Sequence, residues 1–249
     1  MFPRLAAFGA IVLWGISFVA TKAALQEISP ITLIFTRFAM GTAILVFILK
    51  IQGQSPIPPT AAVPSLAVMG FIGIFVHQML QANALTMTTA VRTGWLIGLT
   101  PIWSAALSAI FLQEKFGSRK VLGLILGTIG AITVVARREM SSAVLALPAT
   151  MGDLLILAST VNWAIYTILG RETLKRLGST KATAAAMFAG WAMLIPFYVQ
   201  GSGWREYAAL SATGAGAVLF LGIGCSGLGY WFWNAALEQL EAAQVAAFL

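Results

Sequence analysis

Charged residues are scarce in this chain. Aspartate, glutamate, lysine and arginine make up 9% of its 249 residues, whereas hydrophobic residues make up 59%. A soluble domain carries about 25% charged residues, because it must present a polar surface to water. The composition therefore excludes a soluble globular protein and indicates a polytopic membrane protein whose outer surface contacts lipid.

Other absences narrow the function. Cysteine occurs once, at Cys225, so the sequence has neither a disulfide framework nor a cysteine-based metal motif. It also lacks the G-x-x-x-x-G-K-[ST] phosphate loop, which leaves ATP-driven pumping without support in this chain. The single histidine, His77, has no carboxylate beside it in sequence, as an intramembrane catalytic site would need. We therefore expect no enzyme, no metal and no cofactor.

Long apolar runs fill most of the sequence. A hydrocarbon core about 30 Å thick requires roughly 20 apolar residues of helix, and these continuous runs lack the period-two alternation of a membrane β-barrel. We predict an all-α polytopic protein with helices near 5–24, 28–50, 64–86, 89–112, 118–136, 151–170, 183–200 and 213–236, and a ninth that opens near 242. The ninth run is too short to cross a membrane, so we expect the sequence to be truncated there.

The basic residues predict an orientation. The net charge of +7 is spread among the loops, so we expect lipid and small molecules as partners and no nucleic acid. The positive-inside rule predicts that the N-terminus lies in the cytoplasm. We expect the protein to be located in the plasma (inner) membrane. The cytoplasmic side then holds Arg4, Lys50, Lys115, Arg119, Lys120, Arg171, Lys175, Arg176 and Lys181. The other side holds fewer: Lys22, Arg92, Arg137, Arg138 and Arg205.

The chain resembles itself at an offset of about 150 residues. Leu13-Trp14-Gly15 aligns with Asn162-Trp163-Ala164, and Asn83-Ala84-Leu85 aligns with Asn234-Ala235-Ala236 after one residue of slippage. Five predicted helices precede the second copy, so it enters the membrane with opposite polarity. Inverted repeats are typical of secondary transporters, whose substrate site lies near the midplane between the repeats. We predict a first repeat at 1–136, a connecting loop at 137–150 and an incomplete second repeat at 151–249.

Four short stretches occur in order along both halves. They are Leu13-Trp14-Gly15-Ile16-Ser17-Phe18; Ile28-Ser29-Pro30 with Arg37-Phe38; Ala84-Leu85, Thr88-Thr89-Ala90, Pro101 and Glu114; and Asn234-Ala235-Ala236-Leu237 with Ala242-Ala243. In this combination the chain resembles the EamA-domain transporters of the drug/metabolite transporter superfamily over essentially its whole length. The resemblance implies ten helices in two inverted five-helix repeats. It also implies movement of small metabolites, often export of amino acids or related compounds.

Polar side chains within membrane helices are costly and usually face the bundle interior, so they are candidate site residues. One cluster occurs in the third predicted helix, and the equivalent positions of the eighth carry aromatic residues. Trp14 and Trp163 lie about ten residues into their helices, roughly 15 Å deep, where anchoring at the interface does not explain them. We predict a central cavity lined by helices 1, 3, 6 and 8, with helix 4. Its substrate-binding residues would be Trp14, His77, Gln78, Gln81, Asn162, Trp163, Tyr166, Tyr230 and Trp233.

Several sequence patterns allow a second interpretation. His77 and the glutamines can instead serve only to hydrogen-bond helices together. Arg37 is expected to hold a neighbouring helix end, and Pro101 to kink its helix. The glycines Gly123, Gly127 and Gly130 fit either a homodimer face or close packing within one subunit. A channel-like facilitator or a structural membrane protein is the alternative to a carrier, because a pore also has a polar lining.

Overall fold

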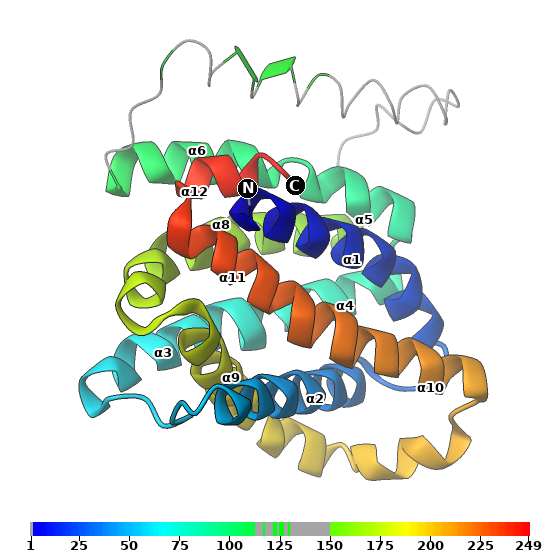
Figure 1. Ribbon diagram of the computed structural model, residues 1–249. Helices are drawn as coiled ribbons and strands as arrows, with labels where there is room; N and C mark the ends of the chain where they lie inside the picture. The colour runs from blue at the N-terminus through cyan, green and yellow to red at the C-terminus, as the bar shows by residue number, and fades with distance from the viewer. Residues whose placement is uncertain (1, 113–116, 118–121, 124, 127–128, 130–149) are drawn as a thin grey trace.

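The computed structural model describes residues 2–112, 117, 122–123, 125–126, 129 and 150–249, and within them it is helical, without strands. Seven segments of these residues are long and apolar enough to cross a membrane (Figure 1). In the first half they are α1 (Phe2–Ala24), α2 (Pro30–Ile51), the run η1 (Thr60–Ala62), α3 (Val63–Gly70), η2 (Phe71–Val76) and α4 (His77–Met87), and the pair α5 (Ala90–Ile97) and α6 (Thr100–Phe111). In the second half they are α8 (Met151–Leu177), α9 (Ser179–Gln200), and the run α10 (Ala212–Leu219), η4 (Phe220–Gly229) and α11 (Tyr230–Gln239).

The predicted spans correspond to these segments, with longer ends at α8 and α9. The short helices η3 (Gly203–Ala209) and α12 (Ala242–Ala246) complete the described chain, and α12 begins where the ninth apolar run was expected to open. The predicted fifth helix at 118–136 and the connecting loop fall mostly outside the described residues. So do Gly127, Gly130 and the basic residues of those segments.

Short polar side chains set the helix starts. Ser29 accepts a hydrogen bond from Thr32 N at the start of α2, and Ser211 accepts one from Gly214 N at the start of α10. Thr150 and Asp153 form a capping box that begins α8. Because the first turn of a helix has unpaired N–H groups, such caps fix where each helix starts even in uniformly apolar sequence.

Pro101 has a larger effect than the predicted kink. The helix that contains it is interrupted, because α5 ends at Ile97 and α6 begins at Thr100. Proline lacks an N–H and clashes with the preceding turn, but it suits the first turn of a new helix. Residues 98 and 99 therefore divide this membrane segment into two helices.

Two π-helical segments, η2 and η4, interrupt the third and last long runs. In such segments a carbonyl accepts from the N–H five residues on, as Ile72 O does from His77 N, and a side chain can add a second hydrogen bond to it. Asn162 Nδ2 donates to Ile72 O (2.8 Å) in η2. In η4, Trp14 Nε1 donates to Cys225 O (3.0 Å). Each π segment is thus stabilised by a side chain from the other half of the chain.

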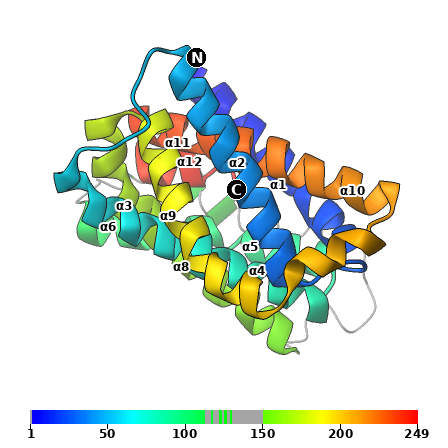
Figure 2. The ribbon, with the colours of Figure 1, turned by 90° about the horizontal axis from the view of Figure 1, so that it is seen from below.

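The halves are interleaved. Helix α2 packs on α9 and η4, α4 packs on α8, and α1 packs on α11 (Figures 1 and 2). Helices α3 and α9 cross closely: a Cβ added at Gly190 would lie 2.5 Å from Gly70 O. Side chains larger than hydrogen would separate these two backbones, so the glycines allow the contact.

Two loops on one side of the bundle are tied by paired serine and glutamate residues. Glu27 accepts hydrogen bonds from Ser211 N (2.6 Å) and Ser211 Oγ (2.7 Å). Across the same pair of loops, Glu206 accepts hydrogen bonds from Ser29 N (2.6 Å) and Ser29 Oγ (2.8 Å). Because each serine is the N-cap of a helix, the two carboxylates join the α1–α2 loop to the α9–α10 loop through helix N-termini.

Candidate functional site

The structure contains a cavity of about 380 Å³ between the two halves of the chain. Small-molecule sites typically measure about 300–1,000 Å³. The described walls of this cavity come from α1, α2, α4, α5, α6, α8 and α11. The sequence predicted walls from the first, third, sixth and eighth helices together with the fourth, and the structure adds a wall from α2.

Helix α4 forms the most polar wall, with His77, Gln78 and Gln81. All three lie within the first five residues of α4, which begins where η2 ends. The amide of Gln78 is held in place by hydrogen bonds. Gln78 Nε2 donates to the Tyr230 hydroxyl (3.0 Å), which in turn donates to Gly73 O (3.1 Å). The amide oxygen of Gln78 is therefore directed away from Tyr230, toward α2.

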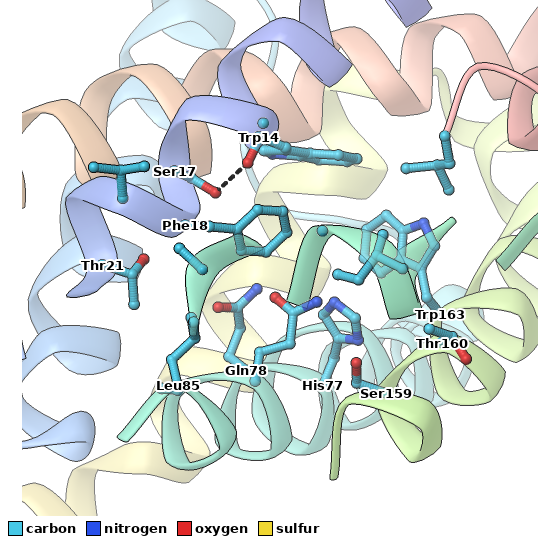
Figure 3. A pocket seen from close by; sticks show the side chains of 18 of the residues that line it. Trp14, Ser17, Phe18, Thr21, His77, Gln78, Leu85, Ser159, Thr160 and Trp163 are labelled. Carbon is cyan, nitrogen blue, oxygen red and sulfur yellow. Dashed lines mark hydrogen bonds between the residues drawn. The ribbon is translucent and has the colours of Figure 1, made fainter. Parts of the chain in front are cut away.

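Helix α1 forms the facing wall. Figure 3 shows Trp14 and Phe18 of α1 across the cavity from His77 and Gln78 of α4. Ser17 donates its hydroxyl to the backbone carbonyl of Trp14 (2.6 Å), which satisfies the hydroxyl within the helix. The Trp14 ring is fixed from the other half of the chain by its bond to η4.

Trp14 is the centre of an aromatic cluster. Its ring centroid lies 5.2 Å from Trp163, 5.4 Å from Tyr230 and 5.4 Å from Trp233. Trp163 in turn lies 4.7 Å from the His77 ring. Edge-to-face pairs at these distances are favourable, and exposed aromatic faces can cover an apolar or a cationic part of a solute. The cluster joins both halves of the chain at the wall of the cavity.

Six of the nine predicted site residues line the cavity: Trp14, His77, Gln78, Gln81, Trp163 and Tyr230. Three are placed elsewhere. Asn162 is directed to the carbonyl of Ile72, so its amide stabilises η2. Tyr166 is buried and its hydroxyl bonds to Asn234 (3.2 Å), while Trp233 is fully buried behind Trp14 and Trp163. These three support the wall and do not form its surface.

Comparison with known proteins gives the family. The sequence matches the EamA-like transporter family over residues 1–136 and 150–249. The chain belongs to this family. The two matched segments lie in the two halves, so the chain folds as two EamA repeats and is an integral membrane protein of the drug/metabolite transporter superfamily.

Several curated relatives of this EamA-like transporter are also named as transporters. An uncharacterized transporter of Archaeoglobus fulgidus is 29% identical over 245 residues, which cover 96% of this chain and 82% of that protein. The uncharacterized transporter YyaM of Bacillus subtilis is 28% identical, over 94% of this chain and 77% of that one. A probable terminal-alkyne amino-acid exporter of Streptantibioticus cattleyicolor is 24% identical, over 96% and 77%. A crystal structure with 21% identity superposes with a TM-score of 0.77 over 98% of this chain and 82% of that chain, which supports the fold.

The sequence did not predict that Arg37 lies at the cavity. Its guanidinium was expected to hold a helix end, but Arg37 also lines the cavity, where the residue is only 6% exposed. Hydroxyl residues of the wall were missed as well, among them Ser159 and Thr160. Serine and threonine are common in membrane helices and give no signal in one sequence, whereas the depth of Arg37 in its helix was the available signal.

Acidic side chains are absent from the described lining of the cavity. Within the described residues, no cluster of histidine, cysteine and carboxylate side chains has the composition of a metal site. Glu114 and Glu139 lie outside those residues. The buried Asp153 lies at the start of α8, where it pairs with Arg92 at 2.9 Å. The described surface of the cavity therefore combines one fixed positive charge with amides, hydroxyls and aromatic rings.

Proposed function

We propose that this EamA-like transporter is a secondary carrier that exports a small metabolite, an amino acid or a related compound, across the plasma membrane by alternating access. The observation that carries the proposal is the composition of the cavity wall. Trp14 and Gln78 of the first repeat meet Trp163 and Tyr230 of the second around one central space. A solute held there contacts both repeats, as a carrier that rocks one repeat against the other requires.

The relatives support the class of solute. One is named as a probable amino-acid exporter, and the cavity has the volume and the mixed polar and aromatic walls that suit a molecule of that size. Trp14, His77, Gln78, Gln81, Trp163 and Tyr230 are the residues that we propose contact it. The remaining three, Asn162, Tyr166 and Trp233, then hold these contact residues in position.

Uptake into proteoliposomes tests the carrier. Radiolabelled proteinogenic amino acids should enter with saturable kinetics and show counterflow when the same compound is preloaded. A channel-like facilitator would show neither property. Uptake that remains linear at millimolar concentration would therefore exclude the carrier and favour a pore.

Substitutions test the site. Gln81→Ala removes an amide that lines the cavity and has no hydrogen bond to another described residue, so it should reduce uptake without loss of folding. Trp163→Ala should reduce uptake too, and because it also leaves a void, its folded fraction must be measured by gel filtration. Trp204→Ala is the control, since Trp204 is 49% exposed in η3 and lies outside the cavity lining. Normal uptake by both cavity variants would contradict the site.

Orientation has its own test. With a cytoplasmic N-terminus, the α2–α3 loop lies in the cytoplasm and the α9–α10 loop outside. Single cysteines at the exposed positions Ser55 and Arg205 should then react oppositely with an impermeant maleimide in intact cells. Cys225 is buried and serves as the unlabelled background. Labelling at position 55 and protection at position 205 would show the opposite orientation, with the N-terminus outside.

A further inference from the structure

Arg37 is a buried cation whose charge is not balanced by a side chain. Its Nε donates to Ser226 Oγ (2.8 Å), and its Nη1 lies 3.5 Å from Gln78 Oε1. Both acceptors are neutral. No carboxylate side chain of the described residues forms an ion pair with Arg37. A buried charge without a counter-charge is destabilising, so an anion that reaches Arg37 gains strongly from binding there.

The guanidinium is held in position from several helices. Ser226 belongs to η4, and Gln78 is itself oriented by Tyr230 of α11. The ring of Phe38 lies beneath it, with the centroid 5.3 Å from Cζ. Groups fixed in advance bind a ligand without a further ordering cost. Because Nε is already bonded, the remaining N–H groups on the Nη side are the ones left for a ligand in the cavity.

The surroundings select the kind of anion. Of the described lining residues, Arg37 alone carries a fixed charge, so the cavity neutralises one negative charge and leaves a second one unpaired. A planar carboxylate matches the guanidinium fork with two parallel bonds. The aromatic rings of Trp14, Trp163 and Tyr230 then cover an apolar body. No carboxylate in the described lining pairs with a substrate ammonium group.

We propose that Arg37 is the group that binds the substrate carboxylate, and that the cavity selects monocarboxylates with an apolar or aromatic body. This inference rests on the proposed carrier, because it concerns the same cavity. It goes further because it states that the solute must carry a negative charge and need not carry a positive one. Arg37 thereby has two roles: it connects α2 to α4 and η4, and it selects solutes by their charge.

Binding to the purified, detergent-solubilised protein tests this charge rule. Tryptophan fluorescence reports on the cavity because Trp14 and Trp163 line it. The probes are 3-phenylpropanoate, its neutral amide 3-phenylpropanamide, the zwitterion phenylalanine and the cation phenethylamine, together with a short aliphatic acid and its amide. The carboxylates should bind at least about tenfold more tightly than their amides, and phenethylamine should bind weakest.

Substitution of Arg37 separates recognition from structure. Arg37→Gln should abolish the preference for carboxylate over amide, and Arg37→Lys should retain part of it because the charge remains. A purely structural arginine would weaken both probes equally and leave their ratio unchanged. Ser226→Ala, which keeps the guanidinium, should preserve the preference and allows the test if Arg37→Gln does not fold.

Equal binding of acids and amides by the unmodified protein, or no binding of either, would overturn the proposal. So would an unchanged ratio in Arg37→Gln. These outcomes differ from failure of the carrier, which is judged by saturation and counterflow in proteoliposomes. A protein that prefers carboxylates but shows linear uptake would retain this inference and lose the proposed mechanism of transport.

Discussion

Trp14 donates its indole N–H to the backbone carbonyl oxygen of Cys225, with 3.0 Å between Nε1 and the oxygen. The bond crosses from α1 of the first repeat to the π-helical η4 of the second. It satisfies a carbonyl in a segment where the regular α-helical pattern is interrupted. One side chain therefore lines the cavity and also stabilises the irregular backbone behind it.

Trp14→Phe should lower the stability of the protein by about 1–3 kcal/mol, because it leaves the Cys225 carbonyl without this donor. Trp191→Phe is the matched control. Trp191 is also half-buried, but its Nε1 has no hydrogen-bond partner among the described residues, so the same change in ring size removes no bond. Thermal unfolding in detergent compares the two. Equal losses would show that the Trp14 bond contributes nothing beyond ring packing.

The ion pair between Arg92 and Asp153 should respond unequally to loss of either partner. Asp153 is fully buried, whereas the Arg92 side chain is 33% exposed. Arg92→Gln removes the cation that lies 2.9 Å from a buried carboxylate and should cost about 3 kcal/mol. Asp153→Asn leaves an arginine that water can reach, and asparagine retains an acceptor for the α8 cap, so the loss should be smaller. Chemical unfolding of both variants and their double mutant measures the coupling, and the opposite order would contradict this account.

Glu27 gives the stability a dependence on pH. Hydrogen bonds from the backbone N–H and the hydroxyl of Ser211 lower the pKa of this carboxyl below its ordinary value of 4.5. A lowered pKa in the folded state means that the contribution is present above the unfolded value and is lost as pH falls through the folded one. Glu27→Gln should therefore reduce the melting temperature at neutral pH, and the deficit should shrink as the pH falls below 4.5 and through the lowered pKa of the folded state.

Glu172→Gln is the matched control substitution, because Glu172 is exposed on α8 and has no hydrogen bond or ion pair to another described residue. It should leave the melting temperature at neutral pH unchanged. A deficit of Glu27→Gln that stays constant down to pH 3 would show that the carboxylate charge is not what stabilises the loop.

Gly190→Ala should destabilise the protein by about 1–3 kcal/mol, because the new methyl group would press on Gly70 O and on Ile74 of the other repeat. Gly216→Ala is the matched change in an open position: a Cβ at Gly216 meets nothing within 4 Å. It should be neutral or slightly stabilising, since alanine favours helix more than glycine does. Similar effects of the two substitutions on the melting temperature would argue against backbone contact at the crossing.

The membrane helices were predictable from the sequence because their signal is length and hydropathy, which depend little on neighbours. The two tryptophans at equivalent depth, Trp14 and Trp163, were predicted to face a shared space and both line the cavity. Their signal was also simple: a large residue with a polar N–H at a depth where the interface cannot explain it.

The direction of polar side chains was harder to predict. In a helix that is apolar on every face, periodicity does not show which side is buried. Asn162 was predicted to contact substrate, and the structure directs it to the carbonyl of Ile72 in the π-helical η2. Arg37 was predicted to hold a neighbouring helix end because a charge facing lipid is costly. Its neutral partners, Ser226 and Gln78, lie too far away in sequence to indicate its place at the cavity. Both cases depend on tertiary contacts that one sequence does not reveal.

The two π-helical segments also break the internal symmetry of the chain. η2 begins at Phe71 and η4 at Phe220, the same offset that aligns Trp14 with Trp163. They end at different registers, because η2 has six residues and η4 has ten. Regular α-helix therefore resumes with His77 and Gln78 in one repeat and with Tyr230 in the other. The polar wall and the aromatic wall of the cavity are thus not images of one another under the repeat, so a solute meets a different surface on each side.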